Sequence, residues 1–429
     1  MAIVKPFRAI RPAEQYVKEV AALPYDVYSR EEARAAVAGH PLSFLNIDRP
    51  ETQFPEDHDM YAEDVYEKAD AMLRQQCRDG IYVKEDRAGY YVYELTMDGR
   101  TQTGIVALSS VDDYLHDVCR KHENTVEKKE LDRIRHVDTV SAQTGPIFLA
   151  YRAREEIQAI TKKAKEQNAL YDFTAEDGIR HRVFRIDDET MVEALESAFQ
   201  QVPFTYIADG HHRAASAVKV ALKRRQQHPE YTGKEEFNYF LSVLFPDNEL
   251  KILDYNRVVK DLNGWTPADF MESLEESFTV TQVTTAFTPK QKGEILLYIS
   301  GEWFLLHAKE AVLETRKEDP VRSLDVALLQ EVVLEPLLGI GDPRTDPRIS
   351  FVGGIRGLKE LEKQVDRNTY QHSMDGTLDR VGPACAFAMH PTAIGELLAV
   401  ADAKRLMPPK STWFEPKLRS GIFIHEIER

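Results

Sequence analysis

The five consecutive residues Asp209-Gly210-His211-His212-Arg213 form the part of the sequence in which polar chemistry is densest. The five residues before them are rich in β-forming side chains, and after them apolar residues recur at the spacing of one helix face. We therefore expect a strand, a tight turn at Asp-Gly, and a helix whose first turn holds the two histidines and the arginine. The backbone N–H groups and the positive dipole end of such a helix bind anions.

The side chains at this turn are of the kinds that bind phosphate. Arg213 offers a planar, always-charged fork, histidine donates hydrogen bonds and titrates near neutrality, and Gly210 lets the backbone approach a ligand closely. Asp209 would lie beside the same ligand. Two other interpretations stay open, a surface turn with solvated side chains and a metal site. The metal site is awkward for His211 and His212 together, because adjacent helical residues point about 100° apart.

A second polar segment, residues 120–125, precedes a stretch that we expect to be helical over residues 126–134. Its Glu123 would lie near the helix N-terminus, and Thr125 would follow it. There a carboxylate either caps the helix or acts as a general base toward a bound hydroxyl. The alternative is the charged first turn of an ordinary helix.

A third segment, residues 407–417, joins a stiff proline stretch to Lys410, Ser411, Thr412 and aromatic residues. An ammonium group beside hydroxyl groups suits a phosphate or a carboxylate. An ordinary C-terminal loop with buried aromatic side chains explains the segment equally well.

The rest of the sequence indicates an α+β (mixed α/β) protein, in which strands and helices follow one another without repeats. We expect a hairpin around Ser300-Gly301, because a turn signal there separates two β-rich runs. The other expected strands are 89–95, 104–108 and 386–389, and the other expected helices are 60–76, 324–338 and 391–401. We also expect a helix N-cap at Ser29, and three regions, 1–105, 106–265 and 266–429, with the central one carrying the chemistry.

Composition restricts the class of protein. A chain of 429 residues is ordinarily divided into about two or three domains. The formal net charge of −16 disfavours nucleic-acid partners, which need a basic face. No apolar run approaches the roughly 18 residues of a membrane span, and the start does not suit a signal peptide, so we expect a cytoplasmic protein. Three widely spaced cysteines favour reduced thiols over disulfides or a zinc ribbon.

These segments together resemble a known enzyme family. The Asp-Gly-His-His-Arg run resembles the motif of the free serine kinases, whose fold is similar to the ParB/sulfiredoxin nucleotide-binding domain. His122-Glu123, followed by residues 129–131, is similar to the segment that carries their catalytic glutamate, and residues 409–412 resemble their C-terminal Pro-Lys-Thr-Thr segment. The whole chain also resembles a large bacterial family of unknown function, with residues 24–27 among its landmarks.

The resemblance implies a role for each matching residue. Glu123 would take the proton from the serine hydroxyl, and Asp209 would orient the reacting groups or a magnesium ion. Gly210, His211, His212 and Arg213 would hold the phosphate, with His212 also catalytic. Thr125, Lys410, Ser411 and Thr412 would bind the substrate. The implied partners are serine and a nucleotide, ATP or ADP with Mg²⁺; the metal ligands and the oligomeric state stay unknown.

The predicted function is a kinase that converts serine to O-phospho-L-serine, since phosphoryl transfer depends mostly on positioning and charge neutralisation. Two alternatives use the same residues. One is a metal-dependent phosphohydrolase of a small phosphorylated metabolite, and the other is a non-enzymatic nucleotide-binding regulator. A P-loop is excluded because GxxxxGK[ST] is absent.

Overall fold

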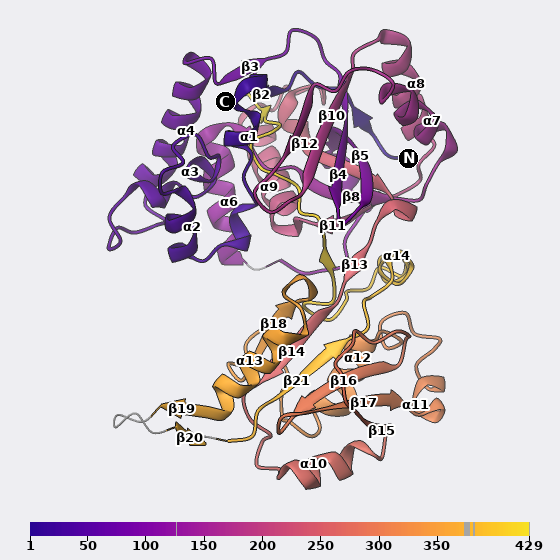
Figure 1. Cartoon of the computed structure of the whole chain (residues 1–429). Helices are drawn as coiled ribbons and strands as arrows, with labels where there is room; N and C mark the ends of the chain where they lie inside the picture. The colour runs from indigo at the N-terminus through magenta and orange to yellow at the C-terminus, as the bar shows by residue number, and fades with distance from the viewer. Residues whose placement is uncertain (126, 373–377, 381, 429) are drawn as a thin grey trace. The chain divides into compact units, whose positions relative to one another are not determined.

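The chain forms two compact units, Met1–Leu250 with Pro416–Arg429 and Lys251–Glu415. The computed structural model describes residues 1–125, 127–372, 378–380 and 382–428, and within these ranges it leaves the side chains of 128, 129, 370–372 and 378–380 undescribed. Both units contain helices and strands (Figure 1), so the predicted mixed α/β class is confirmed. Within the described ranges, no helix has both the length and the apolar composition needed to cross a membrane.

A nine-stranded mixed sheet forms the centre of the first unit. Its strands follow the order β6-β11-β8-β12-β5-β4-β10-β9, with β1 paired to β5. Two pairs, β6 with β11 and β8 with β12, are parallel, and the other pairs are antiparallel. The strands are β1 Val4–Lys5, β4 Tyr90–Met97, β5 Arg100–Ser110, β6 Cys119–Arg120, β8 Ile147–Tyr151, β9 Tyr171–Thr174, β10 Arg180–Ile186, β11 Thr205–Asp209 and β12 Tyr239–Pro246.

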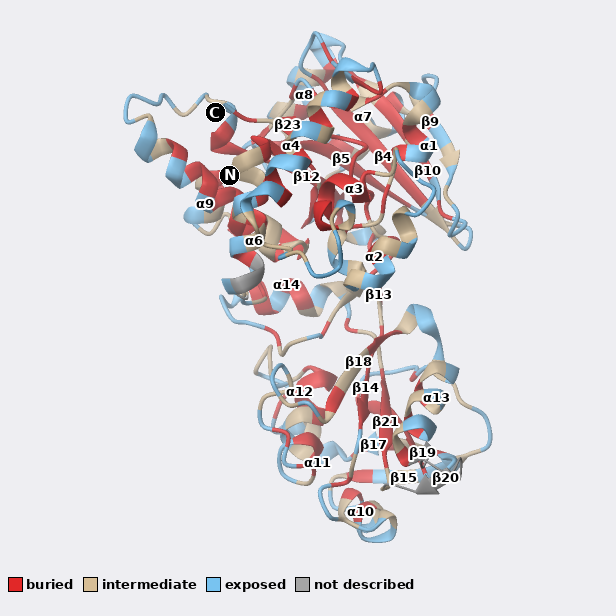
Figure 2. Ribbon diagram, turned by 90° about the vertical axis from the view of Figure 1, so that its left-hand side faces the viewer, coloured by how far each residue is buried: buried red, intermediate tan, exposed pale blue. Residues whose placement is uncertain are grey.

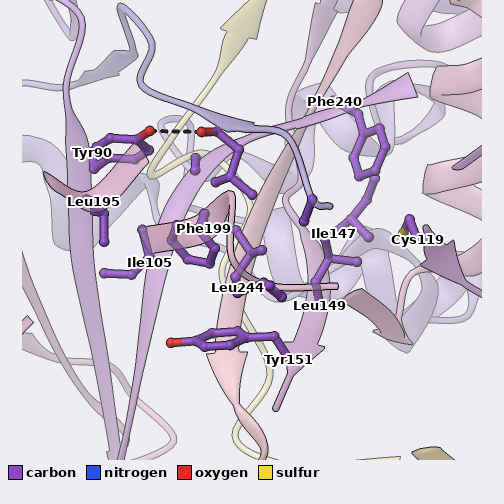
Figure 3. Packing of buried hydrophobic residues seen from close by; sticks show 14 of the residues in the cluster. Tyr90, Ile105, Cys119, Ile147, Leu149, Tyr151, Leu195, Phe199, Phe240 and Leu244 are labelled. Carbon is purple, nitrogen blue, oxygen red and sulfur yellow. Dashed lines mark hydrogen bonds between the residues drawn. The ribbon is translucent and has the colours of Figure 1, made fainter. Parts of the chain in front are cut away.

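Helices pack on this sheet through their apolar faces. The sequence predicted one apolar face of α9 from five residues. Four of them, Ala214, Ala217, Val218 and Ala221, are buried with side chains of β5, β8 and β12 in one core cluster, whereas the fifth, Leu222, is exposed. Figure 3 shows part of that cluster, where the Tyr90 hydroxyl donates to the Val4 carbonyl at 2.9 Å. The longer helices of this unit are α2 Arg30–Val37, α4 Glu63–Arg78, α6 Glu127–Val140, α7 Glu155–Ala164, α8 Glu189–Phe199 and α9 His211–Gln227.

The second unit is built on an antiparallel six-stranded sheet in the order β15-β17-β16-β21-β14-β18. Figure 2 shows buried strands at the centre of this sheet and exposed residues on its helices; β14, β16 and β21 are buried along their whole length, whereas the edge strand β15 is mainly exposed or half-buried. The strands are β14 Tyr255–Val259, β15 Phe278–Val283, β16 Glu294–Ile299, β17 Glu302–Ala308, β18 Ile349–Gly353 and β21 Cys385–Met389. The helices are α10 Pro267–Leu274, α11 Glu310–Glu314, α12 Asp325–Leu329, α13 Leu358–Thr369 and α14 Ile394–Asp402.

Most locally encoded elements lie where the sequence predicts them. The hairpin of β16 and β17 turns at Ser300 and Gly301, whose φ angles are 54° and 82°. Ser29 caps α2 in a reciprocal capping box with Glu32. The expected helix at 324–338 is instead α12 followed by a π-helical stretch, Gln330–Leu334. The three cysteines are free thiols, as predicted.

The boundaries of the compact units differ from those of the three predicted regions. Residue 105 lies inside β5, which pairs along its length with β4, and β14 joins strands of the second unit. The predicted division into 1–105, 106–265 and 266–429 stays a prediction about functional regions, because compactness does not assign function.

Candidate functional site

The Asp-Gly turn lies at the junction of a strand and a helix, as the sequence predicts. Strand β11 ends at Asp209, and α9 begins at His211. Gly210 between them has a φ of 92°, and a Cβ added there would lie 3.0 Å from Nε of Arg213. Glycine is therefore required both for the left-handed backbone and for the close approach of the guanidinium. The N-cap residue Gly210 has no side chain to cap α9, so the backbone N–H groups of the first turn suit a bound anion.

Two segments distant in sequence meet at this turn. Strand β6 pairs in parallel with β11, so the residues that follow each strand emerge at the same edge of the sheet. Glu123 thereby lies beside the start of α9, with its Oε2 3.9 Å from Nδ1 of His211. The rings of His122 and His211 meet edge to face, with 4.5 Å between their centroids. One donor atom from each of these three residues lies within 4.8 Å of the others.

The two histidines are neutral under physiological conditions. Burial lowers the pKa of His122 to about 4, although the Asp209 carboxylate and a hydrogen bond to the backbone of Ile207 oppose that shift. Burial also lowers the pKa of His211 well below its usual value, and the neighbouring His122 acts in the same direction. Nδ1 of His122 and Nε2 of His211 are buried and have no hydrogen-bond partner among the described residues.

Asp209 is ionised and lies between two cations. Nζ of Lys417 is 3.6 Å from its Oδ2, and Nη2 of Arg213 donates to the same oxygen at 3.2 Å. Burial of this carboxyl would raise its pKa, but Lys417 and Arg213 outweigh burial and lower the pKa to about 2. The side chain of Asp209 is nevertheless 30% exposed, so a ligand can reach it.

Arg213 is largely committed to the protein itself. Besides Asp209, its Nη1 donates to the carbonyl of Pro146 at 2.7 Å, and the side chain is 10% exposed. Burial acts to lower its pKa, yet Asp209 and Asp26 raise it. Tyr25 and Arg213 also line a small cavity of about 30 Å³, far too small for a nucleotide. The geometry of Arg213 favours a role in holding Asp209 in place. Binding of phosphate by Arg213 stays a prediction.

Thr125 is hydrogen-bonded within the protein. Its hydroxyl donates to Glu130 of α6, and Lys219 of α9 pairs with the other oxygen of that carboxylate. Glu130 is 5% exposed; burial would raise its pKa, but Lys219 and Thr125 outweigh burial and lower it. This bond ties Thr125 to α6. The side chain of Lys129, from the segment that resembles the kinases, lies outside the described residues, and substrate binding by Thr125 stays a prediction.

The predicted substrate-binding residues Lys410, Ser411 and Thr412 belong to the second unit. The hydroxyl of Ser411, 5% exposed, donates to the carbonyl of Pro408. The carbonyl of Lys410, a residue with a φ of 58°, accepts a hydrogen bond from Arg257 at 3.1 Å. The segment is thus a tight, internally bonded loop of its own unit, and its role in substrate binding stays a prediction.

Sequence reasoning missed two residues of this cluster. Lys417 is part of the segment 407–417 that the sequence singled out, but Lys410 was preferred there because of the Pro-Lys-Ser-Thr resemblance. His122 was noticed only as the neighbour of Glu123. The parallel pairing of β6 with β11 brings His122 to His211, and a single sequence holds no signal for that pairing.

Comparison with known proteins assigns the chain to a family. Residues 4–327 match the family described as "Protein of unknown function (DUF1015)". The chain belongs to this family. No curated protein matches the sequence.

Solved structures resemble the DUF1015 chain weakly. A free serine kinase in complex with AMP is 15% identical, with a TM-score of 0.33 over 76% of this chain and 91% of that one. A variant of a free serine kinase in complex with ADP is 15% identical, with a TM-score of 0.34 over 77% and 93%. C-terminally truncated SbnI from Staphylococcus aureus is 10% identical, with a TM-score of 0.34 over 72% and 82%. Similarity at this level decides nothing about activity.

Proposed function

We propose that this protein transfers a phosphoryl group from ATP or ADP to the hydroxyl of free L-serine, giving O-phospho-L-serine. The observation that carries the proposal is the position of Glu123. Its carboxylate, 43% exposed, lies 3.9 Å from His211 at the uncapped start of α9. A base accessible to a small substrate beside an anion-binding helix start is the arrangement that transfer to a hydroxyl requires. The proposal includes a ParB/sulfiredoxin-like core, a cytoplasmic location and no nucleic-acid partner.

The proposed division of labour follows the bonds that change. The serine Oγ forms a bond to the transferred phosphorus while the bond from that phosphorus to the nucleotide oxygen breaks. Glu123 accepts the hydroxyl proton. The backbone at Gly210 and the side chains of His211 and His212 hold the phosphate oxygens, and Lys417 adds positive charge beside them. Asp209 orients this group, since Arg213 and Lys417 hold its carboxylate in place.

Four residues are proposed to bind the serine. They are the residues that the resemblance implies, Thr125, Lys410, Ser411 and Thr412. An ammonium group suits the carboxylate of an amino acid, and hydroxyl groups suit its polar atoms.

Mg²⁺ does not fit the described cluster as a resident ion. Mg²⁺ demands oxygen ligands in octahedral geometry, whereas His122 and His211 offer nitrogen and only Glu123 offers oxygen. Asp209 is already paired with two cations. Mg²⁺ would therefore reach this protein with the phosphates of the nucleotide, and no step is assigned to it here.

A turnover assay tests the proposal. The full chain is mixed with Mg²⁺, with ATP or ADP, and with isotopically labelled serine, and both phosphoserine and nucleotide are quantified. We expect phosphoserine in equal amount to the nucleotide consumed. Phosphate release without serine would replace the kinase by a phosphohydrolase. Nucleotide binding without any turnover would replace it by a regulator. A reaction without protein and one without serine are the controls.

A further inference from the structure

The cluster formed by His122, Glu123 and His211 includes a residue, His122, to which the proposed phosphorylation of serine gives no role. Its two imidazoles are 2% and 6% exposed, and each has a buried ring nitrogen without a hydrogen-bond partner in the described part of the chain. A buried polar atom left unpaired destabilises the folded protein, because it has given up its hydrogen bond to water. Two imidazoles that each carry such an atom, packed edge to face beside the Glu123 carboxylate, indicate that something else completes the site.

We propose that His122, Glu123 and His211 bind one divalent cation of the transition series, in the class of Zn²⁺, Co²⁺, Mn²⁺ or Fe²⁺. Two imidazoles and one carboxylate form a ligand set that suits these ions, and it leaves coordination positions open for a small ligand. The proposal concerns metal binding alone and does not rest on the kinase activity.

The geometry is close to that of a bound site. Ligands about 2.1 Å from a tetrahedral metal lie about 3.4 Å apart, whereas the donor atoms here lie within 4.8 Å of one another. The remaining contraction requires small movements of the ligands. Glu123 has the most room to move, because its side chain is 43% exposed whereas both histidines are buried.

The orientation of His122 matches that of a metal ligand. Its hydrogen bond to the backbone of Ile207 raises its pKa, so the ring donates to the carbonyl. Because Nδ1 has no partner, Nε2 is the donor, and Nδ1 keeps its lone pair. Histidine ligands of metals ordinarily donate their second nitrogen to a carbonyl or carboxylate in this way, which fixes the tautomer and the ring orientation.

Titration with the metal alone tests the proposal. The full chain is treated with a chelator, freed of it, and titrated with Co²⁺ by visible absorption and with Zn²⁺ by calorimetry, without nucleotide or serine. We expect one ion per chain, not displaced by excess Mg²⁺. His122→Ala and His211→Ala should each weaken binding by more than the roughly 10- to 100-fold lost with a supporting residue. His116→Ala, at an exposed histidine of the same unit, should bind as the unmodified chain does.

The outcomes separate this inference from the proposed function. The metal site would be overturned if the folded chain binds neither ion. It would also be overturned if the His122→Ala and Glu123→Gln chains bind Co²⁺ as tightly as the unmodified chain. Neither outcome affects the result of the turnover assay. Because His122 is buried and its replacement can disturb folding, Glu123→Gln at the half-exposed position is the second variant. It should keep the unfolding temperature of the chain and weaken Co²⁺ binding at least about 10-fold.

Discussion

Lys410 and Lys417 lie seven residues apart in the same proline-rich segment, yet the fold gives them different surroundings. Lys417 returns with residues 416–429 to the first unit, where its Nζ lies 3.6 Å from Asp209. Lys410 remains in the second unit, in a loop whose carbonyls and hydroxyls bond to one another and to Arg257. The resemblance of a short motif predicted Lys410 as a residue of the site, whereas the ion pair with Asp209 indicates Lys417.

The difference teaches which kind of observation locates a site. A Pro-Lys-Ser-Thr motif is compatible both with ligand binding and with a stable turn. The contact of Lys417, by contrast, has a specific electrostatic consequence, because its charge lowers the pKa of Asp209. Asp209 in turn lies near two neutral histidines and a glutamate. The predictions below test whether the cluster around Asp209 carries the chemistry and whether the Lys410 loop contributes to it.

The largest effect is expected at Glu123. Glu123→Gln keeps nearly the same shape but cannot accept a proton, so single-turnover formation of phosphoserine should fall by roughly 10²–10⁴-fold. The loss should appear mainly in kcat, because the interaction belongs to the transition state. Glu127→Gln, an exposed acid at the start of α6, is the matched control and should leave turnover unchanged. Full activity of Glu123→Gln would reduce Glu123 to a charged residue near the helix start.

The next effect separates Arg213 from His212. Arg213→Ala removes two hydrogen bonds of a nearly buried cation, so we expect the free energy of unfolding to fall by about 2–3 kcal/mol. His212→Ala should leave stability nearly unchanged and weaken nucleotide binding about tenfold, the loss of one hydrogen bond to a charged group. Denaturant unfolding and equilibrium nucleotide binding measure the pair. If Arg213→Ala kept full stability and bound nucleotide more weakly, the main role of the arginine would be to bind phosphate.

The two lysines form a direct test of the comparison. Lys417→Met should lower kcat about tenfold, because Asp209 loses one of the two cations that hold it ionised and oriented. Lys410→Met should raise the KM for serine and leave kcat nearly unchanged, if its ammonium binds the substrate carboxylate. Steady-state kinetics on both variants at saturating nucleotide distinguish the two roles. A fall in kcat confined to Lys410→Met would show that Lys410, as the sequence motif predicted, and not Lys417 contributes to turnover.

The local elements of this fold were predictable because their signals are local. The strand, Asp-Gly turn and helix at residues 205–227 follow from β-forming residues, a turn dipeptide and one apolar helix face. The hairpin at Ser300-Gly301 follows from the same kind of signal. The helix expected at 324–338 exists only as α12, Asp325–Leu329, and a π-helical stretch that ends at Leu334, and hydrophobic periodicity does not distinguish a π-helix from an α-helix.

The assembly of the site was not predictable in the same way. Glu123 and Asp209 were each identified, but the pairing of β6 with β11 that joins them depends on strand order across the whole unit. The return of Lys417 depends on the last strand, His425–Glu426, pairing with residues 142 and 143. Such contacts are set by competition among many possible pairings, which one sequence does not reveal.

The smallest effect is expected at Ser411, where the comparison becomes finest. Its buried hydroxyl donates to Pro408 and closes the loop, so Ser411→Ala should lower the free energy of unfolding by about 1 kcal/mol. If the hydroxyl acts only in the loop, kcat/KM for serine should stay within about twofold, and Thr284→Ala at an exposed position should change neither quantity. Thermal unfolding and kinetics on the same preparations measure both.

If instead the hydroxyl of Ser411 contacts serine, kcat/KM should fall about tenfold at nearly unchanged stability, because the Pro408 bond would then be secondary to a bond with the substrate. Ser411→Thr decides between the two: a threonine keeps the hydroxyl and adds a methyl group to a site that is 5% exposed, so it should restore the rate in the second case and destabilise the loop in the first.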